Sequence, residues 1–181
     1  MAAVAIFCLY ANLGADLRSL QTKFSFRYGR VEVRARLPRA DWIRPAIWLL
    51  PENNTYGAFP ASGEIDLMEA TGNLNYHCGH QSRGVDTVQT NIHYGPPGSQ
   101  PPGGLSTVRT NTTDNYADLF HIYELDWTDQ YLAFIIGNYS QTTLMTSRVI
   151  SETKTPSFLD FGVISVRSFQ LNKIKAATSL I

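Results

Sequence analysis

Polar and apolar residues alternate along residues 30–38, which read R-V-E-V-R-A-R-L-P. Because successive side chains of an extended chain point to opposite sides, the apolar residues of this run would share one face and the charged residues the other. An amphipathic helix would need an apolar period of about 3.6 residues instead. The run therefore predicts a strand that is buried on one face.

Further short runs also read as strands, and turn signals such as the Pro/Gly-rich loop at 95–104 separate them. The expected strands lie at 30–38, 45–50, 64–69, 87–94, 120–127, 131–136 and 158–166. No stretch before residue 168 has a convincing helical period, and only the tail at 171–181 fits a marginal helix. Many short strands joined by turns predict an all-β fold, either a sandwich or a jelly roll.

The size and charge of the chain limit the number of domains and the kinds of partner that we expect. One domain is expected for 181 residues, and 44% hydrophobic residues suffice for a substantial core. The 15 basic and 15 acidic residues cancel, so nothing favours a nucleic-acid or an anionic-membrane partner. No apolar run is long enough to span a bilayer. We expect a monomer with no nucleic-acid and no membrane partner.

Three Asn-x-Ser/Thr sequons together favour a secreted, extracellular glycoprotein. They lie at Asn53, Asn111 and Asn138. The apolar run at 2–11 reads either as a short signal-peptide core or as an interior strand, and the sequence leaves both readings open. Whether Cys8 and Cys78 form a disulfide is also open, and no C-x-x-C pattern points to a zinc or redox site.

The most informative segment is G-E-I-D-L-M-E at residues 63–69, which carries three carboxylates on an otherwise apolar strand. Glu64 and Asp66 are two residues apart, so both would face one side of the sheet. Strict alternation would put Glu69, five residues after Glu64, on the other side. A β-bulge at Leu67-Met68 would absorb one residue and return Glu69 to the carboxylate face.

Three readings of this carboxylate segment stay open from spacing alone. A retaining glycosidase needs two carboxyl groups about 5–5.5 Å apart, and side chains leaning together from Cα atoms roughly 13 Å apart could close around a sugar. A merely solvated acidic strand usually carries Lys, Thr or Ser, which are missing here. A calcium loop would need Asp, Asn and Gly at fixed offsets, which are also missing.

The segment at 63–69 resembles the catalytic signature of glycoside hydrolase family 16, in its laminarinase-like branch. The surroundings agree in order and spacing over roughly residues 17–130. The matching stretches are 24–38, P-A-I-W-L-L-P at 45–51, Tyr56-Gly57, P-x-S-G at 60–63, I-H-Y-G-P at 92–96, and Phe120-His121 with Trp127. The resemblance implies a concanavalin-like β-jelly-roll sandwich with an open cleft across one sheet.

Carried over by position, the resemblance assigns Glu64 as the nucleophile, Asp66 as its assisting neighbour and Glu69 as the acid/base. It also implies substrate-binding residues in the cleft, namely Arg34, Trp42, Trp48, Phe59, His93 and Tyr94. Structural readings stay open beside these: Trp48 as core, His93 as an ordinary sheet residue and Arg34 as a surface ion-pair member. Trp127 reads as core. The mechanism requires no cofactor and no metal, because both catalytic groups are side chains.

The chain also departs from the family pattern. Phe59 and Tyr94 stand where Trp is usual, and Thr71 stands where Arg is common. These differences are expected to affect substrate affinity and subsite preference more than the catalytic reaction. The jelly roll is expected to be incomplete at both ends. The expected division is a signal-like or residual N-terminal strand at 1–16, a family-16-like catalytic region at 17–136, and a divergent segment at 137–181.

The resemblance implies hydrolysis of internal β-1,3-glucosidic bonds in a laminarin-type β-glucan, with retention of configuration. One alternative is a non-catalytic β-1,3-glucan recognition protein of innate immunity, a class that typically replaces the catalytic carboxylates. Another is an inactive truncated product. All three carboxylates are present at 64, 66 and 69, which favours the enzyme.

Overall fold

The computed structural model describes most of the chain between residues 20 and 137 and several shorter segments around it. The described residues are 2–6, 8–10, 20–22, 24–41, 43–96, 105–110, 114–137, 139–146, 163–166 and 173–177. Side chains are described for residues 22, 24–41, 43–96, 108, 110 and 114–137.

The described part of the chain consists of strands joined by turns and loops, without any helix, as the sequence predicts for the residues before 168. In chain order the strands are β1 (Ala2–Ile6), β2 (Cys8–Tyr10), β3 (Leu20–Gln21), β4 (Gly29–Ala35), β5 (Ile43–Pro51), β6 (Glu64–Ala70), β7 (His77–Cys78), β8 (Gln81–Ser82), β9 (Thr87–His93), β10 (Leu105–Thr110), β11 (His121–Trp127), β12 (Tyr131–Ile136), β13 (Tyr139–Thr146), β14 (Val163–Val166) and β15 (Lys173–Ala177). Among these residues, no helix is long and apolar enough to cross a membrane.

The prediction of a marginal helix at 171–181 is wrong, because β15 lies there and pairs antiparallel with β4. The strand satisfies backbone groups on the edge of β4 that would otherwise stay unpaired, a tertiary gain that outweighs a weak local preference. The exposed thiol of Cys78 is free, so it forms no disulfide with Cys8.

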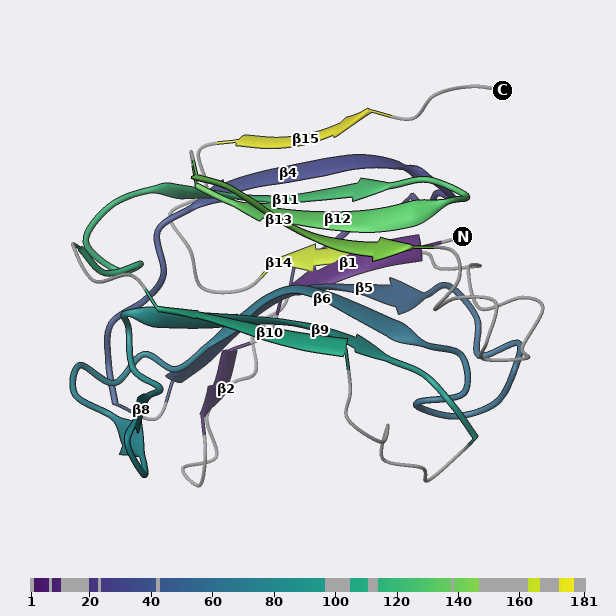
Figure 1. Ribbon diagram of the computed structural model, residues 1–181. Coiled ribbons are helices and arrows are strands. Elements are labelled where there is room, and N and C mark those ends of the chain that lie inside the picture. Colours follow the sequence, from purple (N-terminus) through teal and green to yellow (C-terminus); the bar gives the residue numbers. More distant parts are fainter. Residues whose placement is uncertain are drawn as a thin grey trace.

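Two sheets stack face to face, as Figure 1 shows. The eight-stranded sheet runs β1-β3-β14-β5-β6-β9-β10, with β2 also paired to β5, and the five-stranded sheet runs β13-β12-β11-β4-β15. Strand pairs are antiparallel except for β1 and β14, which run parallel. The short β7 and β8 form a separate hairpin. The architecture is a β-sandwich.

The core fills the space between the sheets. In β4 the predicted alternation is confirmed, since Val31, Val33 and Ala35 are fully buried while the residues between them are not. The facing sheet contributes Ile65 from β6 among others, and each such side chain adds about 1.5–3 kcal/mol on full burial. Trp127 is buried as expected, with its ring edge-on to Phe26 at 6.0 Å between centroids.

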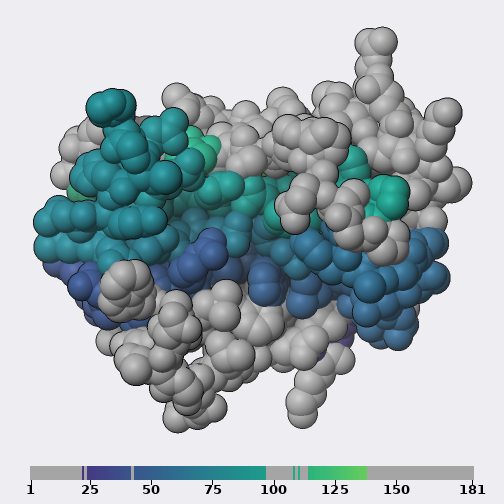
Figure 2. All heavy atoms as spheres, turned by 90° about the horizontal axis from the view of Figure 1, so that it is seen from below, coloured from purple at the N-terminus to yellow at the C-terminus, as the bar shows by residue number. Residues whose placement is uncertain are grey.

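Strand β6 lies in the middle of the eight-stranded sheet, between β5 and β9. Its core-facing side chains leave Glu64, Asp66 and Glu69 on the opposite side, which we call the carboxylate face. Figure 2 views the molecule from this side, where the region of β7 and β8 and the loop at 52–63 stand at opposite ends. The fold thus places the acidic segment in the centre of an outer surface.

Candidate active site

A β-bulge in β6 brings the third carboxylate to the face of the other two. Asp66 pairs with Asn91 of β9 and Glu69 pairs with Gln89, so three steps along β6 match two steps along β9. The extra residue lies at Leu67-Met68, where both side chains are buried in the core. The bulge predicted from the spacing of the acids is therefore confirmed.

Glu64 and Asp66 lie beside a histidine from the next strand. His93 is opposite Glu64 in the register of β6 and β9. Its Nε2 atom lies 2.9 Å from Oδ2 of Asp66 and 3.9 Å from Oε1 of Glu64. The side chain of Asp66 is fully buried and that of Glu64 is 14% exposed. Two carboxyl groups with little access to water thus share one imidazole.

This environment raises the proton affinity of both acids. Burial, and then the charge of Asp66, raise the pKa of Glu64 to about 8, against a smaller opposing effect of His93. Burial, followed by the charge of Glu69, raises the pKa of Asp66 well above its usual range, while its interactions with Asn91 and Glu64 act in the opposite direction. Because the two acids lie close together and each affects the ionisation of the other, they titrate as a pair that can hold one proton between them.

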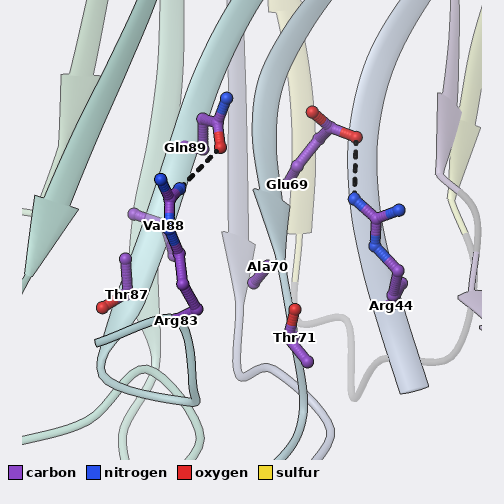
Figure 3. Close-up of a pocket in the computed structure, with 8 residues that line it drawn as sticks. All are labelled: Arg44, Glu69, Ala70, Thr71, Arg83, Thr87, Val88 and Gln89. Atoms are coloured by element: carbon purple, nitrogen blue, oxygen red, sulfur yellow. Dashed lines mark hydrogen bonds and ion pairs between the residues drawn. The ribbon is translucent and has the colours of Figure 1, made fainter. Parts of the chain in front are cut away.

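Glu69 has different neighbours. Its Oε2 atom accepts a hydrogen bond from Nδ2 of Asn91, and its Oε1 atom lies 3.8 Å from Nη2 of Arg44. The residue lines a shallow open pocket that runs along the sheet beyond it. Figure 3 shows Arg44 on one side of Glu69 and Gln89 with Arg83 on the other. The acid therefore sits at an accessible rim among basic and amide groups.

Three of the cleft residues implied by the resemblance lie on the carboxylate face. His93 contacts Asp66 directly, and the ring of Phe59 lies 5.5 Å from the His93 ring, centroid to centroid, with the Phe59 side chain 55% exposed. Trp48 lies two residues after Ala46, which pairs with Glu69, so it shares the face of the acids and is half-buried. The exposed ring of Phe59 offers an apolar surface next to the buried acids.

The structure does not bring the other three together with the acids. The expectation that Arg34 faces the cleft is wrong, because β4 belongs to the five-stranded sheet and Arg34 stacks over Phe120 at 4.4 Å on the far side of the sandwich. Tyr94 packs against the hydrophobic core on the side opposite His93. Trp42 lies outside the described residues.

Four neighbours of Glu69 were missed from the sequence. Gln89 and Asn91 precede His93 at intervals of two, so the alternation T-V-Q-T-N-I-H would have placed them on its face. Arg44 precedes Ala46 by the same interval on β5. Arg83 stands in a loop, where no sequence period applies, and only the tertiary structure brings it to Gln89.

Among the described side chains, one group has the composition and spacing to hold a metal ion. It consists of Glu64, Asp66 and His93, whose donor atoms all lie within 4.8 Å of one another. The donor set of one imidazole and two carboxylates would suit a zinc-type ion. The resemblance assigns Glu64 and Asp66 to catalysis and His93 to substrate binding, so an ion there would compete with the nucleophile.

The fold and the carboxylate face define a jelly-roll sandwich of the laminarinase type. The catalytic domain of an endo-1,3-beta-glucanase (laminarinase) from Thermotoga petrophila RKU-1 superposes with a TM-score of 0.68 at 21% identity, covering 90% of this chain and 64% of that one. The laminarinase from Rhodothermus marinus gives 0.60 at 25% identity, over 90% and 66% of the two chains. The expected all-β jelly roll is therefore confirmed.

The chain belongs to glycosyl hydrolases family 16, whose model matches residues 7–168. It is 43% identical over 134 residues to a beta-1,3-glucan-binding protein of Penaeus monodon, covering 72% of this chain and 34% of that protein. It is 34% identical over 129 residues to glucan endo-1,3-beta-glucosidase A1 of Niallia circulans, covering 70% and 17%. The chain thus spans well under half of these relatives, and the family match extends on both sides of residues 17–136.

Proposed function

We propose that this chain hydrolyses internal β-1,3-glucosidic bonds of a β-glucan with retention of configuration. The observation that carries the proposal is the bulge in β6, which sets Glu64 and Glu69 on one face with Asp66 between them. Two carboxyl groups on one accessible surface are what a double displacement at an anomeric carbon needs. The family membership and the named glucanase relative support the same reaction.

In the first step Glu69 acts as the acid and Glu64 as the nucleophile. Glu69 protonates the glycosidic oxygen while a carboxylate oxygen of Glu64 attacks the anomeric carbon, so the glycosidic bond breaks and a glycosyl ester forms. For this, Glu64 must be ionised although its pKa is raised to about 8. Asp66 lies two residues from Glu64 on the same face and its pKa is also raised, so it can keep the proton that the pair shares.

In the second step Glu69, now ionised, removes a proton from water as the water oxygen attacks the anomeric carbon. The ester bond to Glu64 breaks, the sugar leaves with its original configuration, and Glu69 is again protonated. Burial of Glu64 and Asp66 strengthens the electrostatic interactions around the ester, since little water screens them.

The substrate we propose is a laminarin-type polysaccharide, bound across the carboxylate face. The exposed ring of Phe59 offers the flat apolar surface against which a pyranose face can stack. We propose an extracellular, glycosylated protein that acts as a monomer. The exposed position of Asn53, the first sequon, makes that site accessible to a glycosyltransferase.

Release of reducing ends from laminarin by the purified chain, beside a Glu64→Gln variant, tests the proposal. Release by the parent and none by the variant is the expected result, and ¹H NMR of the first product should show the β-anomer. A parent that melts cooperatively but releases no sugar contradicts hydrolysis by this chain.

A second candidate function is recognition of β-1,3-glucan without cleavage. It is favoured by the 43% identity to a protein named for glucan binding. The two functions share the surface and differ in turnover. Retention of laminarin binding by a folded parent that cleaves nothing, and by Glu64→Gln alike, would establish recognition in place of catalysis.

A further inference from the structure

A row of hydrogen-bonded side chains leads from the loop before β9 to the proposed acid Glu69. Nη1 of Arg83 donates to Oε1 of Gln89 at 3.2 Å, and Nε2 of Gln89 donates to Oδ1 of Asn91 at 2.8 Å. Nδ2 of Asn91 then donates to Oε2 of Glu69. We call Arg83, Gln89 and Asn91 the amide relay; Figure 3 shows its first contact, between Arg83 and Gln89.

The chemistry of arginine gives the amide relay a direction. A primary amide can present either its oxygen or its nitrogen to a neighbour, but a guanidinium has donors only. Next to Arg83, Gln89 must therefore present its oxygen, which turns its nitrogen toward Asn91. Asn91 must then present its own oxygen to Gln89, which turns its nitrogen toward Glu69.

The far end of the relay is held by the backbone. The N–H of Arg83 donates to the carbonyl of Tyr76 at 2.8 Å, and the N–H of Val85 donates to the carbonyl of Asn73 at 2.9 Å. Between them, Gly84 is packed so closely that a Cβ atom there would lie 2.6 Å from the Asn73 carbonyl oxygen. A second hydrogen bond joins Nη2 of Arg83 to Oε1 of Gln81 at 3.1 Å. The guanidinium is thus fixed from several sides.

We propose that the amide relay determines which oxygen of Glu69 carries the proton that is transferred to the substrate. Because Asn91 always offers a donor to Oε2, the protonated acid can carry its hydrogen only on Oε1. After transfer, the N–H of Asn91 stabilises the carboxylate that remains. Arg83 and Gln89 act as positioning residues, because they reach Glu69 only through Asn91. This inference rests on the proposed role of Glu69 as the acid/base.

Gln89→Glu tests the relay by reversing its direction with almost no change in size. A carboxylate at position 89 only accepts, so Asn91 must turn its nitrogen toward it and its oxygen toward Glu69. Protonated Glu69 then donates its hydrogen to Asn91. We expect kcat on laminarin to fall about tenfold or more and the alkaline limb of the pH–rate profile to move up by about one pH unit.

Three further variants separate the relay from a general effect of charge. Gln130→Glu makes the same chemical change in the exposed turn between β11 and β12, and its profile should superimpose on that of the parent. Arg83→Met releases the end of the relay and should shift the alkaline limb in the same direction by less. Arg83→Lys restores a donor and should return most of kcat. A Gln89→Glu profile identical to the parent's overturns the proposal.

The orientation itself is measurable without turnover, which separates the relay from the proposed function. In ¹H–¹⁵N spectra, the side-chain amide signals of Asn91 should report its hydrogen bond to Glu69, so Glu69→Gln should move them from their positions in the parent. Gln89→Glu should change the Asn91 signals strongly. If neither substitution changes the Asn91 signals, the relay is wrong. If both substitutions change them but the parent does not hydrolyse laminarin, only the proposed function is contradicted.

Discussion

The outer faces of the two sheets are both formed by strands of alternating polar and apolar residues. They differ in which charged side chains lie next to their buried acids. On the five-stranded sheet, acids face bases: Oε2 of Glu124 accepts a hydrogen bond from Nη2 of Arg30 at 2.7 Å, and Glu32 lies 3.9 Å from the same arginine. On the carboxylate face, Glu64 and Asp66 lie side by side, and the charge of Asp66 raises the pKa of Glu64. Both faces come from alternating strands, so alternation alone does not make a site.

Each face has a largely buried glutamate, but the charge of its nearest neighbours differs between the two faces. The side chain of Glu124 is 9% exposed and has a cation within hydrogen-bond distance. Glu64 is 14% exposed, and its nearest charged neighbours include another carboxylate that raises its pKa further. A paired buried acid stabilises the fold, whereas like-charged acids held together cost stability and become available for proton transfer. The following predictions test this difference.

The largest contrast is expected in activity. Glu69→Gln should lower kcat/KM on laminarin by about 10²- to 10⁴-fold, the usual contribution of a positioned acid/base. The isosteric change Glu124→Gln on the other face should leave the rate per folded molecule within about twofold. Reducing-sugar assays at matched concentrations of folded protein measure both. Equal losses in the two variants would mean that the faces do not differ in function.

The two faces should also differ in the sign of a stability change. The folded-state pKa of Glu64, about 8, is above its ordinary value of 4.5, so the folded protein holds this proton more tightly than the unfolded chain does. The resulting stability is fully present below pH 4.5 and is lost as the pH rises through about 8. Glu64→Gln cannot ionise, so its Tm should exceed the parent's by about 3 °C or more at pH 9.

The control for that measurement is acid pH, where the parent's Glu64 is protonated in both states. The difference in Tm between Glu64→Gln and the parent should shrink to within about 1 °C at pH 4, because both side chains are then neutral. A variant that is less stable than the parent at pH 9 would show that the ionised Glu64 is well compensated.

Glu124→Gln should change stability in the opposite direction and by less. It removes the partner of Arg30, whose side chain is 56% exposed and therefore screened by water. A loss of about 1 kcal/mol is expected at pH 7, which lowers Tm by about 2–4 °C in a domain of this size. Thermal melts of Arg30→Met and of the double variant supply the double-mutant cycle, and additive losses would contradict a direct interaction.

The smallest effect is expected from metal removal. The proposed reaction uses side chains only, so laminarin hydrolysis after EDTA treatment and desalting should stay within about twofold of the untreated rate. Added Zn²⁺ should inhibit, because Glu64, Asp66 and His93 have the spacing to bind it. A rate that disappears with EDTA and returns with a metal would replace this mechanism by a metal-dependent one.

The sequence by itself determined the strands, the central acidic segment and its bulge. These are local properties: a period of two residues reports which side chains share a face, and an odd spacing between acids on one face requires an extra residue. The same rule would have found Asn91 and Gln89, which precede His93 at even intervals.

Only the tertiary structure decided which polar strand faces the site. Arg34 follows the same alternation as the carboxylates, but pairing places β4 in the other sheet. Strand β15 replaces the weak helix expected near the C-terminus because an edge of β4 offers backbone partners. Arg83 reaches Gln89 from a loop. Sheet membership and loop placement depend on contacts between residues far apart in the chain. A short-range sequence pattern does not predict such contacts.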